Sequence, residues 1–227
     1  LERGQLHIWR KPQRNRHYAL GADVAEGIEL EGAPNDDRHD YSSADVLDRD
    51  TGEQVAHLHG HITPGEFGRA LGLLGRYYNN AFLGVESNAG YGLHVLDELQ
   101  RLDYPAHLLY RQQTLDELTK RPTTKLGWRT TQSNRKSMMA ALDTSLRAKD
   151  VLPNGEETVN ELRAFVTKPN GRIEASAGQK DDRVFSLAIA NQMLAAAPPV
   201  ELDTKPTNDY QPVKYLHTPL IQTFARA

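Results

Sequence analysis

The chain has 227 residues, of which 38% are hydrophobic and 25% are charged, and its formal net charge is −3. These values are typical of a single globular domain, and no apolar run approaches the roughly 20 residues needed to span a bilayer. The sequence contains no cysteine, which excludes disulfides and thiolate ligands, so any bound metal must be held by oxygen or imidazole groups.

Charge is spread unevenly along the chain. Residues 23–50 contain ten acidic and two basic side chains, whereas residues 111–149 contain nine basic and three acidic ones. Two solvated faces of opposite sign would explain this pattern. An acidic metal centre beside a basic surface for phosphates would explain it equally well.

The N-terminal part of the chain predicts three consecutive strands. Residues 6–16 are basic and show no periodicity, so we expect a lead-in segment there. Residues 18–24 alternate between a larger apolar face and a face of small residues that ends in Asp23. Further strands are expected at 43–47 and 54–61, joined by an Asp-Thr-Gly turn. Strands joined in this way predict an antiparallel meander.

Helices and strands are then expected to alternate. Thr63 can cap a helix that has Pro64 at its first position and ends at the Asn-Asn pair 79–80. A short buried strand follows at 81–86 and places Glu86 at its end.

The next helix is predicted at 90–102, with Leu93, Leu96 and Leu99 facing inward, and it is followed by a strand at 106–110. This order predicts parallel pairing with right-handed crossovers. The fold class is therefore α/β, with a mixed sheet of three antiparallel strands and further parallel strands, flanked by helices.

The last part of the chain is expected to be mainly helical. The expected elements are an irregular basic segment at 111–131, helices at 133–149 and 156–164, a hairpin at 165–175, a buried helix at 181–197 and a tail at 198–227.

Acidic residues stand where the expected elements would bring them together. Asp23 and Glu86 end two strands, and the pair Asp181-Asp182 begins the last helix. Groups at strand ends share one edge of a sheet, and clustered carboxylates repel one another unless a hard cation such as Mg²⁺ or Mn²⁺ lies between them. Taken singly, Asp23 could begin a turn and either aspartate of the pair could cap the helix. Together they favour a metal site.

Three histidines, His57, His59 and His61, alternate along one expected strand. Such a stripe could chelate a metal on the strand's face, but an exposed edge strand is the preferred interpretation.

Five motifs resemble the nuclease domain of phage large terminases, in that family's order. They lie at 18–27, 39–46, 85–92, 126–139 and 178–183. The resemblance implies a ribonuclease-H-like fold, two-metal catalysis with Mg²⁺ or Mn²⁺, and cutting of concatemeric viral DNA during packaging. It implies Asp23, Glu86 and Asp182 as catalytic metal ligands and Asp181 as an additional or alternative ligand. The role of Asp40 stays open.

The resemblance also implies partners and a domain organisation. The implied partners are double-stranded viral DNA, the terminase ATPase domain, the portal protein and the small terminase subunit, in the cytoplasm of an infected bacterium. No phosphate-binding loop motif of the ATPase kind occurs in the sequence. We therefore expect residues 1–16 to be a linker from an ATPase domain, 17–197 to be the nuclease domain and 198–227 to be a tail.

Basic residues are expected to hold the DNA backbone, with little base readout. They are Lys125, Arg129, Arg135, Lys136 and Lys180. The alternatives are another ribonuclease-H-like nuclease, such as a junction resolvase or transposase core, and a module that docks on the portal or motor and cleaves weakly.

Overall fold

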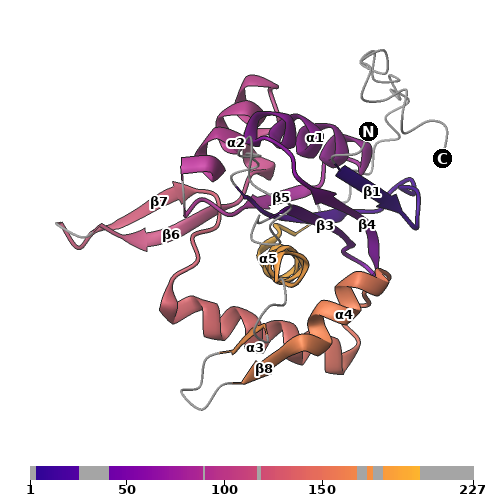
Figure 1. The fold of residues 1–227 in the computed structure, drawn as a ribbon. Helices are drawn as coiled ribbons and strands as arrows, with labels where there is room; N and C mark the ends of the chain where they lie inside the picture. Colours follow the sequence, from indigo (N-terminus) through magenta and orange to yellow (C-terminus); the bar gives the residue numbers. More distant parts are fainter. Residues whose placement is uncertain are drawn as a thin grey trace, which may run out of the picture. The chain divides into compact units, whose positions relative to one another are not determined.

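The structure, a computed structural model, describes residues 4–25, 41–88, 90–116, 119–167, 173–175 and 181–199. Its centre is a five-stranded sheet with the order β1-β4-β3-β2-β5 (Figure 1). The strands are β1 (Gly4–Ile8), β2 (Tyr18–Asp23), β3 (Ser42–Asp48), β4 (Gln54–Gly60) and β5 (Phe82–Val85). The first four pair antiparallel, and β5 runs parallel to β2. The expected mixed sheet is confirmed.

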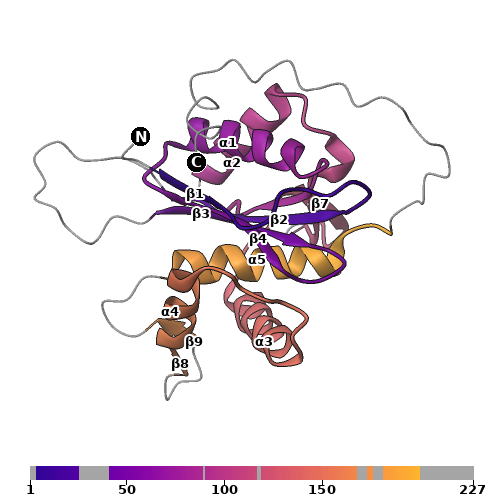
Figure 2. The same ribbon diagram turned by 90° about the vertical axis from the view of Figure 1, so that its right-hand side faces the viewer.

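Helices α1 (Pro64–Tyr77) and α2 (Gly90–Arg101) cover one face of this sheet (Figure 2). Thr63 caps α1, because its hydroxyl accepts a hydrogen bond from the Glu66 N–H and donates one to the Glu66 carboxylate. The face of the sheet toward these helices is apolar and buried, with Leu20, Val46 and other residues of β2 to β5 packed against the two helices.

Helix α5 (Asp182–Ala196) crosses the opposite face of the sheet, over β2, β3 and β5 (Figure 2). Gly21 and Gly84 lie under it. A Cβ added at Gly21 would lie 2.6 Å from Ala190 Cα and 2.7 Å from Ile189 C. These small residues therefore allow the helix backbone to approach the sheet closely. The buried helix was expected, and its position brings its first turn to the end of β2.

Two further helices complete the layer beyond α5. They are α3 (Gln132–Ala148) and α4 (Glu156–Ala164), and both pack against α5. Met138, Met139 and Leu142 of α3 join the second core cluster with the apolar residues of α5. The short strands β8 (Phe165–Thr167) and β9 (Ile173–Ala175) pair antiparallel, as expected for the hairpin, while its turn lies outside the described residues.

Four expectations about individual elements and residues were wrong. Strand β1, whose last three residues fall in the segment expected as a lead-in, pairs with β4 at the edge of the sheet; it is only five residues long, although Leu6 and Ile8 do alternate with Gln5 and His7. A strand was expected at 106–110, but Ala106–Leu108 form a 3₁₀ turn (η1) and only Leu109 bridges to Leu83. The turn forms because the Leu108 N–H is bonded locally to the Pro105 carbonyl.

The segment expected to be irregular forms a second hairpin, β6 (Arg111–Leu115) and β7 (Pro122–Leu126), which extends away from the central sheet (Figure 1). Its side chains are largely exposed, so the strands lack the apolar alternation that would have indicated them. Leu93 of α2 is 52% exposed, contrary to expectation, because Val95, Leu96 and Leu99 form the buried stripe.

Among the described helices, none is long and apolar enough to cross a membrane.

Candidate metal centre

The acidic residues come together through the pairing of β2 with β5. Ala22 lies opposite Val85 in this parallel pair, and the Glu86 N–H donates to the Ala22 carbonyl at 2.9 Å. Asp23 ends β2 and Glu86 directly follows β5, so both carboxylates leave the sheet at the same edge. By the alternation of the strands, both are on the face that carries Gly21 and α5.

The carboxyl group of Asp23 shows how close these acids are. Its pKa is raised well above the ordinary value, first by burial, then by a hydrogen bond with Glu86, and then by the negative charges of Glu86, Asp182 and Asp181. Although the residue keeps some exposed surface, its carboxyl group is surrounded by protein atoms. A hydrogen bond between two carboxyl groups requires a proton on one of them. The structure thus brings the four predicted acids into one electrostatically coupled group.

The chemistry of this group fits a hard divalent cation. Its donors are carboxylate oxygens, which Mg²⁺ and Mn²⁺ prefer, and a positive charge among them would relieve the repulsion that raises the pKa of Asp23. In the arrangement of the described residues, no three His, Asp or Glu side chains are gathered closely enough to hold an ion. Side-chain rotations would therefore be needed to complete a ligand set.

The two aspartates at the start of α5 have different surroundings. Asp181 occupies the N-cap position, but its side chain makes no capping hydrogen bond and is 39% exposed, 3.4 Å from the Arg135 guanidinium. Asp182 is in the first turn, where the helix dipole favours a negative charge, and its side chain is only 8% exposed. The structure therefore does not support the interpretation of Asp181 as a side-chain cap.

Asn88 holds the carboxylate of Glu86 in place. Its amide nitrogen donates to Glu86 Oε1 at 3.2 Å and to the Thr130 carbonyl at 2.7 Å. The chain after the β6–β7 hairpin runs beside the end of β5, where Trp128 bridges to Glu86. Asn88 was not predicted, and its only signal in the sequence is its place two residues after Glu86, within the motif at 85–92.

Four of the five predicted DNA-binding residues lie among the described residues, on β7, just after it, and on α3. Lys125 on β7, Arg129 after it and Lys136 on α3 are exposed. Arg135 instead lies against the site, beside Asp181 and 4.3 Å above the Phe185 ring. Lys180 lies outside the described residues, as do Asp40 and the loop before it.

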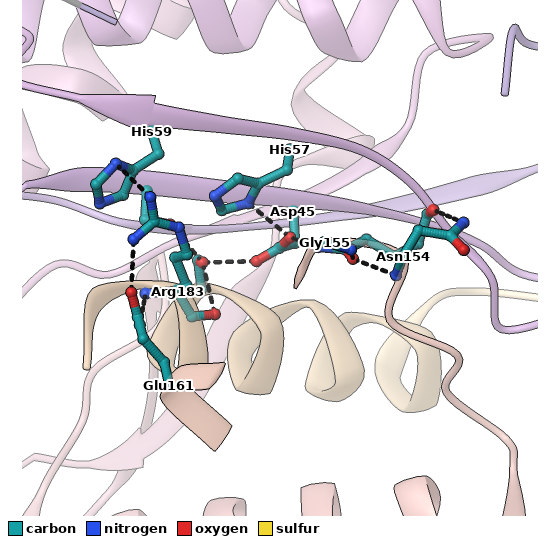
Figure 3. Close-up of polar contacts among 10 residues, drawn as sticks. Asp45, His57, His59, Asn154, Gly155, Glu161 and Arg183 are labelled. Atoms are coloured by element: carbon teal, nitrogen blue, oxygen red, sulfur yellow. Dashed lines mark hydrogen bonds and ion pairs between the residues drawn. The ribbon is translucent and has the colours of Figure 1, made fainter. Parts of the chain in front are cut away.

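The interpretation of the histidine stripe as an exposed edge was wrong. Because β1 pairs with the outer side of β4, the stripe lies on an interior strand, and His57 is only 4% exposed. Its Nδ1 lies 2.9 Å from Asp45 Oδ1 (Figure 3). Asp45 also accepts hydrogen bonds from Gln54 and from Ser186 of α5. This buried network was missed, although the polar alternation of Ser43 and Asp45 within a buried strand was a signal for it.

Crystal structures of phage large terminase nucleases share this fold. The large terminase nuclease from thermophilic phage G20c with bound cobalt aligns with a TM-score of 0.61 and 21% identity, over 84% of this chain and 88% of that one. The same nuclease with bound magnesium gives a TM-score of 0.61 and 20% identity over the same shares. The large terminase nuclease domain of Thermus phage P74-26 gives a TM-score of 0.57 and 22% identity over 84% and 86%.

These alignments confirm the ribonuclease-H-like fold that the sequence predicted. No protein-family model matches the sequence, and no curated protein matches it.

Proposed function

We propose that this chain is the nuclease domain of a phage large terminase, a divalent-metal-dependent endonuclease that cuts concatemeric viral DNA during genome packaging. The observation that carries the proposal is the convergence of Asp23, Glu86, Asp181 and Asp182 at one edge of the sheet, where burial, a hydrogen bond with Glu86 and the charges of the other three acids raise the pKa of Asp23. The fold likeness to nucleases crystallised with cobalt, magnesium and zinc supports the same assignment.

Each acid has a distinct part in this proposal. Asp23, Glu86 and Asp182 would be the catalytic ligands of Mg²⁺ or Mn²⁺, and Asp181 would be an additional ligand. When bound, such ions would lower the pKa of a water molecule and offset the charge on the scissile phosphate, with two ions acting once DNA is present. Asn88 would orient Glu86 through the 3.2 Å hydrogen bond to its carboxylate. Cleavage would be hydrolysis of a phosphodiester bond without a covalent protein intermediate.

The basic side chains would position the duplex across this edge. Lys125, Arg129 and Lys136 are exposed and would contact phosphates, as would Lys180. Arg135 would act closest to the reacting phosphate, since it already lies at the acidic group beside Asp181.

The wider assignment follows from the same proposal. Residues 17–197 would be the nuclease domain, with residues 1–16 linking it to an ATPase domain and 198–227 forming a tail. Its partners would be viral DNA, the portal protein and the small terminase subunit, in the cytoplasm of the infected host.

Cleavage of plasmid DNA by the purified chain with and without Mn²⁺ tests the proposal. The unsubstituted protein should cut the duplex only with the metal, and Asp23→Asn should remove this activity while the far-ultraviolet circular dichroism spectrum is unchanged. Asp97→Asn is the matched control, because Asp97 is exposed on α2, on the other side of the sheet. Undiminished cleavage by Asp23→Asn would refute the metal-ligand assignment. Cutting of four-way junctions in preference to linear duplex would favour a junction resolvase.

A further inference from the structure

A row of polar side chains runs from Glu161 through Arg183 to His59 (Figure 3), and His59 lies near Asp182. It begins at Glu161 on α4, whose carboxylate lies 2.6 Å from the Arg183 guanidinium and also accepts the Arg183 backbone N–H at 3.0 Å. Arg183 on α5 then lies 3.2 Å from Nδ1 of His59 on β4. The other ring nitrogen of His59, Nε2, lies 3.9 Å from Asp182 Oδ2. One row thus joins α4, α5 and β4 at a proposed metal ligand.

The chemistry of Arg183 determines which nitrogen of His59 carries the proton. A guanidinium group can only donate hydrogen bonds, so His59 Nδ1 must be the acceptor. The neutral ring then carries its hydrogen on Nε2, the nitrogen that faces Asp182. A nitrogen that carries a hydrogen cannot also bind a metal, and Nδ1 is occupied by Arg183. This geometry argues for His59 as a donor to a ligand and against His59 as a ligand.

Packing fixes the plane of the His59 ring. Tyr41 stacks on it with ring centroids 4.6 Å apart and an angle of 21° between the planes. His57 lies parallel on the same strand, with centroids 6.0 Å apart. The His59 side chain is only 11% exposed. A ring held in this way can present its N–H in one direction only, and a small rotation of Asp182 would bring the carboxylate within hydrogen-bonding distance.

We propose that His59 is a positioning residue for Asp182, with its Nε2–H directed at that carboxylate by Arg183 and Glu161. The inference rests on the proposed function, in which Asp182 is a metal ligand. Replacing a group that orients a metal ligand in this way typically lowers metal affinity by roughly 10- to 100-fold. His59 would then hold the Asp182 carboxylate in one orientation, although Asp182 is the first residue of α5 and helix ends usually fray.

Mn²⁺ binding measured by titration calorimetry tests this role, together with the Mn²⁺ concentration that gives half-maximal DNA cleavage. His59→Ala should weaken Mn²⁺ binding by about 10- to 100-fold. His59→Gln should restore most of the loss, because its amide N–H₂ can take the place of Nε2–H. His94→Ala, at an exposed position on α2, is the matched control and should leave both quantities unchanged.

A double-mutant cycle tests whether Arg183 acts through His59. Replacing Arg183 by Met and Glu161 by Gln together removes the ion pair without leaving a buried lone charge. This pair of changes should weaken Mn²⁺ binding in the unsubstituted background but add little in the His59→Ala background.

The outcomes separate this inference from the proposed function. If the unsubstituted protein neither binds Mn²⁺ nor cuts DNA, both fail. If it does both and His59→Ala matches it, only the role of His59 is overturned. The role is also overturned if His59→Gln, with an unchanged thermal midpoint, binds Mn²⁺ as weakly as His59→Ala, since the loss would then not depend on a donor at Nε2.

Discussion

Substituting Gly21 by alanine would test how closely α5 must approach the sheet. The added Cβ would lie 2.6 Å from Ala190 Cα and 2.7 Å from Ile189 C, both of which are helix backbone atoms. Carbon atoms in contact are normally about 3.5–4.0 Å apart, so the helix would have to move away by roughly 1 Å. Gly84 provides a matched comparison, because a Cβ there would meet Met193 Cε at 2.8 Å and Cγ at 3.0 Å, which belong to a flexible side chain.

The expected losses follow from what must move. Overpacking a core typically lowers the free energy of unfolding by about 1–3 kcal/mol. The loss for Gly21→Ala should be at or above the upper end of this range, because a whole helix is displaced. The loss of stability for Gly84→Ala should be near the lower end of this range, since the Met193 side chain can rotate away. A misplacement of about 1 Å at a reacting centre can reduce a rate by about 100-fold, and α5 carries Asp182.

Urea unfolding monitored by circular dichroism would give the free energy of unfolding of both variants, and Mn²⁺-dependent cleavage would give their rates. Gly21→Ala should be the less stable and the less active of the two. Equal stabilities, or a Gly21→Ala variant within about 0.5 kcal/mol of the unsubstituted protein, would refute the reasoning that this glycine sets the distance between helix and sheet.

Three further predictions concern the acidic group and the basic surface. Because the pKa of Asp23 is raised in the folded state, the native protein holds more protons than the unfolded chain above pH about 4, so this group makes stability fall as pH rises. In EDTA at pH 7, Asp23→Asn should therefore unfold at higher urea concentration than the unsubstituted protein, and a lower midpoint would contradict this. Asp182→Asn should lower Mn²⁺-dependent cleavage more than Asp181→Asn, because Asp181 is more exposed and faces Arg135; the reverse order in a cleavage assay would reassign the ligand. Lys125→Ala should weaken DNA binding and reduce the slope of log K against log salt by about 0.9 in fluorescence anisotropy, whereas an unchanged slope would remove Lys125 from the phosphate contacts.

The sequence predicted strands β2 to β5 and the places of the acids at the ends of their elements, because both depend on short-range patterns. Alternation in 18–24 placed Gly21 and Asp23 on one face, and the structure has α5 over that face. The capping residue Thr63 and the Asn-Asn pair at 79–80 marked the ends of α1 within a residue or two. These signals depend on residues a few positions apart, which is the range over which patterns can be read.

The contacts that the sequence could not predict join residues far apart in the chain. Glu161, Arg183 and His59 come from three elements, and nothing in their local patterns relates them. The β6–β7 hairpin was not predicted for another reason: its exposed strands are paired by backbone hydrogen bonds and carry no apolar periodicity. The interior position of His57 depended on β1, a five-residue strand whose pairing with β4 no local pattern indicated.

The order of the elements along the chain determines when the acidic group can form. Asp23 and Glu86 become neighbours once β2 and β5 pair, but Asp182 arrives only when α5, near residue 190, docks on the opposite face. Until then Ala19, Leu47 and Phe82 have no partner layer, because their cluster is completed by α3 and α5. During synthesis, Asp23 and Glu86 could therefore come together well before Asp182 joins them. The complete acidic group would form only when nearly all of the fold has formed.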